Sequence, residues 1–237
     1  MKRPQAPLTA FTSLCAAPLL LASCSTGGQM LTKSGFLPDY GKLQKPKRKN
    51  VAIWVSSGYQ SEVYHQVIID EPKWLAPHRD PKVEAAMREA LRESLIATLS
   101  ISHRVIPDVA TAPAGTLRVR SAITGIRRTR WFLNAPLQVA TFAAGGLGIL
   151  APLSGGASVE IVVDDAASRN SVLQMATYRN GQPWNIKGSY VAYDHARQAF
   201  EQSAKALAYF IKQPALATPS TLHSKSGSSG KYESRQN

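Results

Sequence analysis

Thr116-Leu-Arg-Val-Arg-Ser-Ala-Ile-Thr124 is the stretch that decides the fold. Apolar and polar side chains alternate along it with a period of two, which predicts a half-buried β-strand. The predicted inner face holds Leu117, Val119 and Ile123, and the outer face holds Arg118 and Arg120. A strand of this kind needs a neighbouring strand on each side and an apolar layer over its inner face.

Further strands are predicted on both sides of this stretch. Ala157-Ser-Val-Glu-Ile-Val-Val-Asp164 repeats the alternation, with Val159, Ile161 and Val163 facing inward. The turn-forming residues 165–170 lead to a third strand over 172–178. Shorter β-rich runs at 51–55 and 105–106 predict two more strands.

Two amphipathic helices are predicted to supply the apolar layer. Asp80 caps the first helix and Pro81 occupies its first position. Its apolar stripe is Val83, Met87, Leu91, Leu95 and Leu99. Asp194 begins the second helix, whose stripe is Ala196, Phe200, Ala204, Leu207 and Ile211. The order of elements predicts an α+β domain, a small antiparallel or mixed sheet with two helices packed on one face.

The N-terminus has the features of a bacterial export signal. Two basic residues, Lys2 and Arg3, precede a short apolar run that ends in small residues. Leu21-Ala-Ser-Cys24 resembles a lipobox. That resemblance implies cleavage before Cys24 and acylation of its thiol and of the new amino group. Ser25, in place of aspartate, favours the outer membrane. The alternative is an ordinary signal peptide with an incidental cysteine.

The chain divides into four parts by composition. Residues 1–23 form the lipoprotein signal peptide, 24–49 a lipidated basic tether, 50–213 the α+β periplasmic domain, and 214–237 a disordered tail. Within the tether, an apolar stretch is predicted to pack as a short strap against the domain. Its apolar side chains are Phe36, Leu37, Tyr40 and Leu43.

The net charge of +13 is unevenly distributed. Residues 25–49 carry +5, whereas the much longer segment 50–213 carries only +4. Export and this distribution argue against a nucleic-acid-binding protein. Of the two cysteines, Cys15 leaves with the signal and Cys24 carries lipid, so the mature chain has no thiol for a disulfide or a metal.

No motif for catalysis or cofactor binding is found. Ser56-Ser57-Gly58 follows a strand but is interpreted as a turn, because no helix follows closely. Gly145-Gly-Leu-Gly148 lacks the strand, helix and Lys-Ser/Thr ending of a phosphate loop. The histidines are scattered, and His195 is predicted to be a surface residue. We therefore expect no enzyme activity, no cofactor, no metal and no small-molecule substrate.

Two neighbouring features indicate a binding surface. A basic cluster comprises Arg118, Arg120, Arg127, Arg128 and Arg130, followed by Trp131. It suits anionic lipid, lipopolysaccharide phosphates or an acidic protein partner, although a solvated strand face is an equal alternative. Residues 131–159 then carry no charge. We interpret 131–153 as an apolar loop that lies on its own domain, on lipid or against a partner.

Three blocks of sequence resemble the bacterial lipoproteins grouped as domain of unknown function 3313. They are Leu21-Ala-Ser-Cys24, Ser34-Gly-Phe-Leu-Pro-Asp-Tyr-Gly-Lys-Leu43 and Gly155-Gly-Ala-Ser-Val-Glu-Ile-Val-Val-Asp164. The resemblance implies no activity and no catalytic residues. The expected function is an outer-membrane-anchored periplasmic lipoprotein that binds an envelope component or protein partner without catalysis. The alternative is a subunit of an oligomeric secretion or pore complex that inserts residues 131–153.

Overall fold

The computed structural model describes residues 33–46, 50–77, 80–127, 155–180 and 193–217. Within these ranges, seven strands form one mixed sheet in the order β1-β7-β6-β5-β2-β4, and β3 also pairs with β5. The strands are β1 (Val51–Val55), β2 (Gln66–Ile69), β3 (Lys73–Trp74), β4 (Arg104–Val105), β5 (Thr116–Arg127), β6 (Gly156–Asp165) and β7 (Ser171–Asn180). The short 3-10 helices are η1 (Tyr40–Lys42), η2 (Ser61–Val63) and η4 (Pro214–Ala217).

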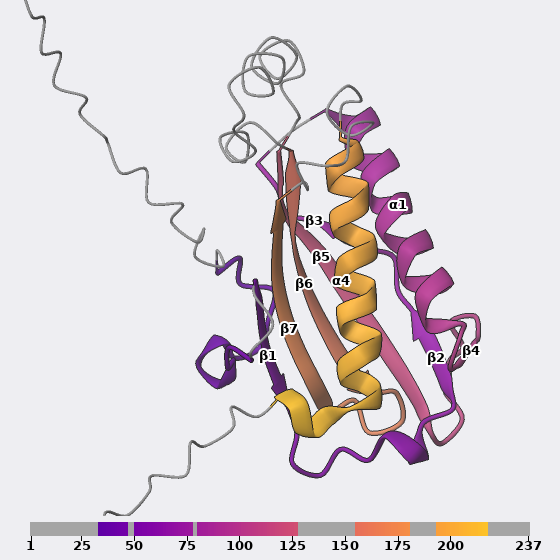
Figure 1. The fold of residues 1–237 in the computed structure, drawn as a ribbon. Coiled ribbons are helices and arrows are strands. Elements are labelled where there is room, and N and C mark those ends of the chain that lie inside the picture. The colour runs from indigo at the N-terminus through magenta and orange to yellow at the C-terminus, as the bar shows by residue number, and fades with distance from the viewer. Residues whose placement is uncertain (1–32, 47–49, 78–79, 128–154, 181–192, 218–237) are drawn as a thin grey trace, which may run out of the picture.

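Two long helices, α1 (Pro81–Leu99) and α4 (Asp194–Lys212), lie side by side on one face of this sheet (Figure 1). The cap predicted for α1 is present, because the side chain of Asp80 accepts a hydrogen bond of 3.0 Å from the backbone N–H of Lys82. The predicted α+β class, with a mixed sheet and two helices on one face, is confirmed.

The core lies between the helices and the three central strands. The predicted inward residues of β5 and β6 are all buried there, together with alternate residues of β7. These sheet residues are Leu117, Val119, Ile123, Val159, Ile161, Val163, Leu173 and Met175. The helices contribute the stripes expected from sequence, of which only Val83 is partly exposed. Burial of this apolar surface is the main force that closes the domain.

β2 was not predicted from the sequence, although Val67-Ile68-Ile69 is a run of β-branched residues. β2 pairs in parallel with both β5 and β4, so the sheet is mixed rather than antiparallel. The strand predicted at 105–106 is β4, displaced by one residue. The tail predicted over 214–237 begins too early, because Pro214–Ala217 form η4 and Ala217 is buried in the core. The predicted signal peptide, Cys24, the segment 131–153 and residues 218–237 lie outside the described residues.

Candidate functional site

The basic cluster lies on β5, on the sheet face that points away from the helices. Arg118 and Arg120 alternate there with the buried residues of the strand, as predicted. A register shift between Ile123 and Gly125 inserts one extra residue opposite β6. Ile126 therefore packs against the core, and Arg127 points to the same face as the other two arginines. Arg128, Arg130 and Trp131 lie outside the described residues.

Arg118 is held between two carboxylates. Its Nη2 lies 2.9 Å from Asp70, and its Nη1 lies 3.0 Å from Asp108. Hydrogen bonds to Asp70 and Asp108 raise the pKa of the Arg118 guanidinium. All three nitrogens of the guanidinium donate to these two side chains, so its donors already have acceptors within the chain.

Arg120 also has an acidic partner, since its Nε donates to Asp164 at 2.7 Å. Both arginines line a cavity of about 340 Å³ between β5, β6 and residues 109–112. Asp164, Asp165 and Arg169 complete its charged lining. The structure thus adds carboxylates to what the sequence presents as a basic patch, and the surface carries alternating charges.

The strap lies on this same face, nearer to β1 (Figure 1). Leu37 is buried and packs against Val162 of β6 and Ala176 of β7. Phe36, Tyr40 and Leu43 surround it as partly buried neighbours. The packing predicted for these four side chains is confirmed. Apolar residues in a basic tether therefore mark a segment that belongs to the folded domain.

A buried carboxyl group fixes the strap to the sheet. Glu160 of β6 is 2% exposed and accepts hydrogen bonds from the hydroxyl groups of Ser34, at 2.6 Å, and Tyr40, at 2.7 Å. The Tyr40 oxygen in turn accepts a bond of 2.9 Å from the backbone N–H of Gly35. All described hydrogen-bond partners of the Glu160 side chain come from the strap, so this latch (Ser34, Tyr40 and Glu160) joins residues 120 or more positions apart.

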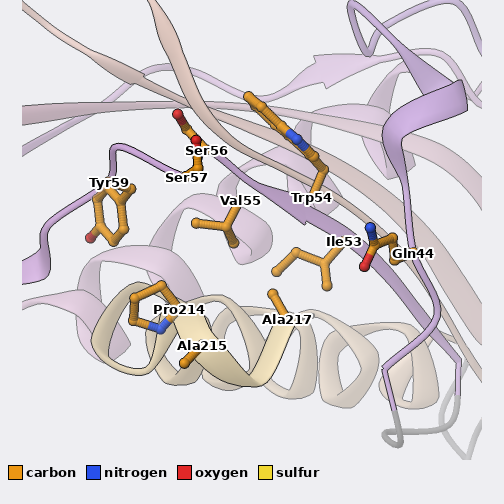
Figure 2. A pocket seen from close by; sticks show the side chains of 10 residues that line it. All are labelled: Gln44, Ile53, Trp54, Val55, Ser56, Ser57, Tyr59, Pro214, Ala215 and Ala217. Atoms are coloured by element: carbon orange, nitrogen blue, oxygen red, sulfur yellow. The ribbon is translucent and has the colours of Figure 1, made fainter. Parts of the chain in front are cut away.

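A groove of about 440 Å³ runs along the outer edge of β1. Figure 2 shows Trp54 on one side of the strand and Pro214, Ala215 and Ala217 of η4 on the other. Gln44 closes one end by pairing with Ile53, and the turn at Ser56 and Ser57 closes the other. The bond from the N–H of Tyr59 to the carbonyl of Ser56, at 3.1 Å, confirms that turn.

The groove offers binding surface rather than reactive groups. Tyr59 is the titratable side chain among its lining residues, and burial, with smaller effects of Tyr64 and Glu62, raises its pKa. Its hydroxyl donates to the carbonyl of Ile211 at 3.1 Å. A protonated, hydrogen-bonded phenol is a poor base for the nearby serine hydroxyls.

One histidine prediction is wrong. His195, expected at the surface, is 1% exposed and lies at the start of α4. It stands four residues before the buried Ala199 and therefore continues the buried stripe of the helix. Across the described ranges, no group of three His, Cys, Asp or Glu side chains is arranged to hold a metal ion.

Glu160 was missed as a site residue. An indication was present in the sequence, because Glu160 is an acidic residue between the apolar residues Val159 and Ile161 of a predicted strand. What sequence alone does not give is its partner, because Ser34 and Tyr40 lie far away along the chain.

Several solved structures resemble this fold at low sequence identity. The PelC dodecamer from Paraburkholderia phytofirmans covers 65% of this chain and 96% of its own, with 9% identity and a TM-score of 0.38. Protein XCC0632 from Xanthomonas campestris covers 68% and 91%, with 11% identity and a TM-score of 0.32. The hypothetical protein CT253 from Chlamydia trachomatis covers 64% and 98%, with 15% identity and a TM-score of 0.34. Likeness at this level carries no information about function.

Comparison of the sequence with known proteins and protein families identifies the family of the chain. No curated protein matches the chain. Residues 32–207, which include the strap, the whole sheet and most of α4, match the family described as protein of unknown function (DUF3313). The chain therefore belongs to this family.

Proposed function

We propose that the protein is a non-enzymatic periplasmic lipoprotein, anchored in the outer membrane through Cys24, that holds a binding domain close to the membrane. The position of the strap is the main support for this proposal. Among the described residues, the strap contacts the domain as early in the chain as Ser34, which bonds to Glu160. An anchor at Cys24 is then separated from the domain by ten residues, which span about 35 Å when fully extended. A tether reaching to residue 49 would span more than twice that distance.

A short tether suits a protein that meets its partner at the membrane surface. Several acyl chains hold a protein on a bilayer far more firmly than one chain does. On this proposal, the basic residues in and just after the strap would lie near anionic headgroups, which attract Lys and Arg by about 1 kcal/mol each. The domain would thus stay at the membrane while its outer surfaces remain open to a second envelope component.

The basic cluster remains the proposed contact for an anionic partner. Arg118 and Arg120 would have to exchange an internal carboxylate for the partner's anion, so their contribution depends on that exchange. Arg127 lies on the same face of β5, and Arg128, Arg130 and Trp131 follow it in the sequence.

The pore alternative concerns residues 131–153, which lie outside the described residues. Among the helices that the structure describes, none is long and apolar enough to cross a membrane.

Fractionation of cells tests the anchor. Cys24→Ala should abolish globomycin-sensitive processing and release the protein from the membrane fraction. Cys15→Ala is the matched control, because it removes the other cysteine and should leave processing and membrane attachment unchanged. Membrane attachment of the Cys24→Ala protein at wild-type levels would exclude the lipid anchor.

Vesicle binding tests the anionic contact separately. The Cys24→Ala protein should bind phosphatidylglycerol vesicles more strongly than phosphatidylcholine vesicles, and added salt should weaken that preference. Equal binding to both vesicles would leave a protein partner as the remaining target of the cluster.

A further inference from the structure

At the outer edge of β1, the backbone N–H and C=O of Val55 have no partner among the described residues. Alternate residues of β1 bond to β7, as shown by the 2.9 Å bond from the N–H of Ser56 to the carbonyl of Val172. Val51, Ile53 and Val55 therefore point their N–H and C=O groups outward. Ile53 exchanges two bonds of 2.8 Å with Gln44 of the strap. Val55 has no such partner among the described residues.

The opposite edge of the sheet has the same feature at Ile69 of β2. The N–H of Asp70 bonds to Val119 of β5 at 3.0 Å, so the neighbouring residue faces outward. Beside β2, the N–H of Ile106 bonds to the carbonyl of Val67 at 3.0 Å. The segment that follows β4 then leaves the edge of β2 at Pro107. Within the described ranges, the N–H and C=O of Ile69 then have no partner.

These two open positions lie in one row across the sheet. Val55 is opposite Leu173, Leu173 opposite Val163, Val163 opposite Val119, and Val119 opposite Ile69. A second copy placed edge to edge in the same orientation would therefore bring its Ile69 beside Val55 of the first copy.

The strand directions allow these two residues to pair. Three antiparallel pairings and one parallel pairing separate β1 from β2, so the two strands run in opposite directions. An antiparallel pair of outward-facing residues exchanges two N–H···O=C bonds. The Gln44–Ile53 pair already shows that arrangement on the β1 edge.

The charges beside the two edges are complementary. A cavity of about 480 Å³ at the β2 edge is lined by four carboxylates and two guanidinium groups. Its charged residues are Asp70, Glu71, Glu89, Asp108, Arg92 and Arg118. The groove at the β1 edge is flanked instead by lysines: Lys42 and Lys45 on either side of Gln44, and Lys212 at the end of α4. Some of these charges already have partners within the chain: Lys42 lies 3.6 Å from Asp39, Arg118 is paired with Asp70 and Asp108, and Glu71 is paired with Arg88. The complementarity between the edges is therefore smaller than the number of charged residues indicates.

We propose that copies of this chain associate head to tail, with the β1 edge at Val55 of one copy pairing with the β2 edge at Ile69 of the next. The row of residues that joins Val55 to Ile69 sets the register between the two copies. The backbone N–H and C=O groups of these two residues supply the hydrogen bonds, and the opposite charges favour contact between unlike edges. A contact between two unlike edges continues from copy to copy and forms a ring or a filament. This inference is independent of the lipid anchor.

Val55→Pro is the sharpest test. Proline removes an N–H that the fold does not use, and proline is tolerated on edge strands whose N–H faces outward. Val55→Thr is the matched control, because it keeps both the N–H and the β-branched shape. Sedimentation of the full lipidated protein in detergent should show concentration-dependent association for wild type and for Val55→Thr. The dissociation constant of Val55→Pro should rise by at least about tenfold.

Mixing wild-type protein with the Val55→Pro variant distinguishes a head-to-tail contact from a symmetric one. The Val55→Pro protein still has an intact Ile69 edge, so fluorescently labelled Val55→Pro should bind wild type and, in excess, terminate its assemblies as dimers. A symmetric β1–β1 contact would instead exclude the variant from wild-type assemblies, and would overturn the proposal.

Charge exchange tests the direction. Glu89→Lys and Lys212→Glu should each associate with themselves more weakly than wild type. A mixture of the two should recover association with the two variants alternating, because one contact keeps the wild-type charges and the other has both charges exchanged. Circular dichroism should show wild-type folding for every variant used. A wild-type protein that is monomeric at all concentrations, or assemblies that Val55→Pro leaves unchanged, would each overturn the proposal.

Discussion

The two faces of the sheet are stabilised in different ways. The helix face is a continuous apolar layer, in which Leu173 and Met175 of β7 meet α4 and its fully buried Phe200. The strap face holds a small apolar cluster around Leu37, the latch at Glu160 and three arginine–carboxylate ion pairs. Damage to the helix face should therefore spread through the whole domain, whereas damage to the strap face should stay local.

Leu173→Ala should have the largest effect. The side chain is fully buried between the sheet and the helices. Truncation of such a leucine typically lowers the free energy of unfolding by about 2–5 kcal/mol, because it leaves a cavity that the surroundings fill only in part. Denaturant titration should show a lower midpoint with an unchanged slope. A loss below about 1 kcal/mol would mean that the helix face is not a tightly packed layer.

Tyr40→Phe should weaken the strap without unfolding the domain. It removes the hydroxyl that donates to Glu160 and that accepts from the N–H of Gly35. Loss of such bonds typically lowers stability by about 1–3 kcal/mol. The measured loss cannot exceed the free energy of strap docking, because a weakened strap detaches while the rest of the domain stays folded. Limited trypsin cleavage after Lys42 should become several-fold faster, while the global denaturation midpoint changes little.

Leu173→Ala is the reciprocal control for this experiment. It should lower the global midpoint and leave cleavage after Lys42 unchanged under strongly native conditions. Equal effects of the two variants on both measurements would mean that the strap and the core unfold together, and the distinction between the faces would be lost.

Most of the fold could be predicted from the periodicity of the apolar residues. The stripes of both helices and the alternation of the three long strands could be read directly, because each depends only on which residues must face a common core. The short parallel strands β2 and β3 carry little periodic signal. Their pairing with β5 depends on contacts between residues about 50 positions apart, which propensity does not encode.

The polar face was harder to predict for a related reason. Alternation placed Arg118 and Arg120 on the correct face, but did not reveal that Asp70 and Asp164 would reach them. An ion pair depends on where distant carboxylates lie in the folded chain. The bulge that brings Arg127 to the same face is likewise a property of the pairing with β6 and not of β5 alone.

His195 gives the helix face a dependence on pH. Burial lowers its pKa below the ordinary value, against the opposing effects of Asp194 and a hydrogen bond with Gln198. The unfolded chain therefore binds a proton at a higher pH than the folded chain does. Stability should fall as the pH drops below about 6.5, by at most about 1.4 kcal/mol per pH unit for one group.

Comparison of wild type with His195→Phe at pH 7.5 and pH 5.5 checks this assignment. Phenylalanine keeps a ring at the position and removes the titration, so the variant should lose less stability on acidification. Burial also lowers the pKa of His103, and His103→Gln separates its contribution. An unchanged pH dependence in His195→Phe would assign the effect to other groups.

Asp108→Asn should have the smallest effect, although it removes a charge from Arg118. The Asp108 side chain is 65% exposed, and Arg118 keeps its contact with Asp70 at 2.9 Å. Exposed ion pairs contribute about 0–1 kcal/mol, because water screens the charges and both side chains lose freedom. The more buried Asp164, with 10% of its side chain exposed, is the matched comparison. Asp164→Asn should lower the unfolding free energy more than Asp108→Asn does, since Arg120 has no second carboxylate within the described residues. The reverse order in denaturant titrations would mean that the residues around Asp108 pack on the sheet more firmly than their exposure indicates.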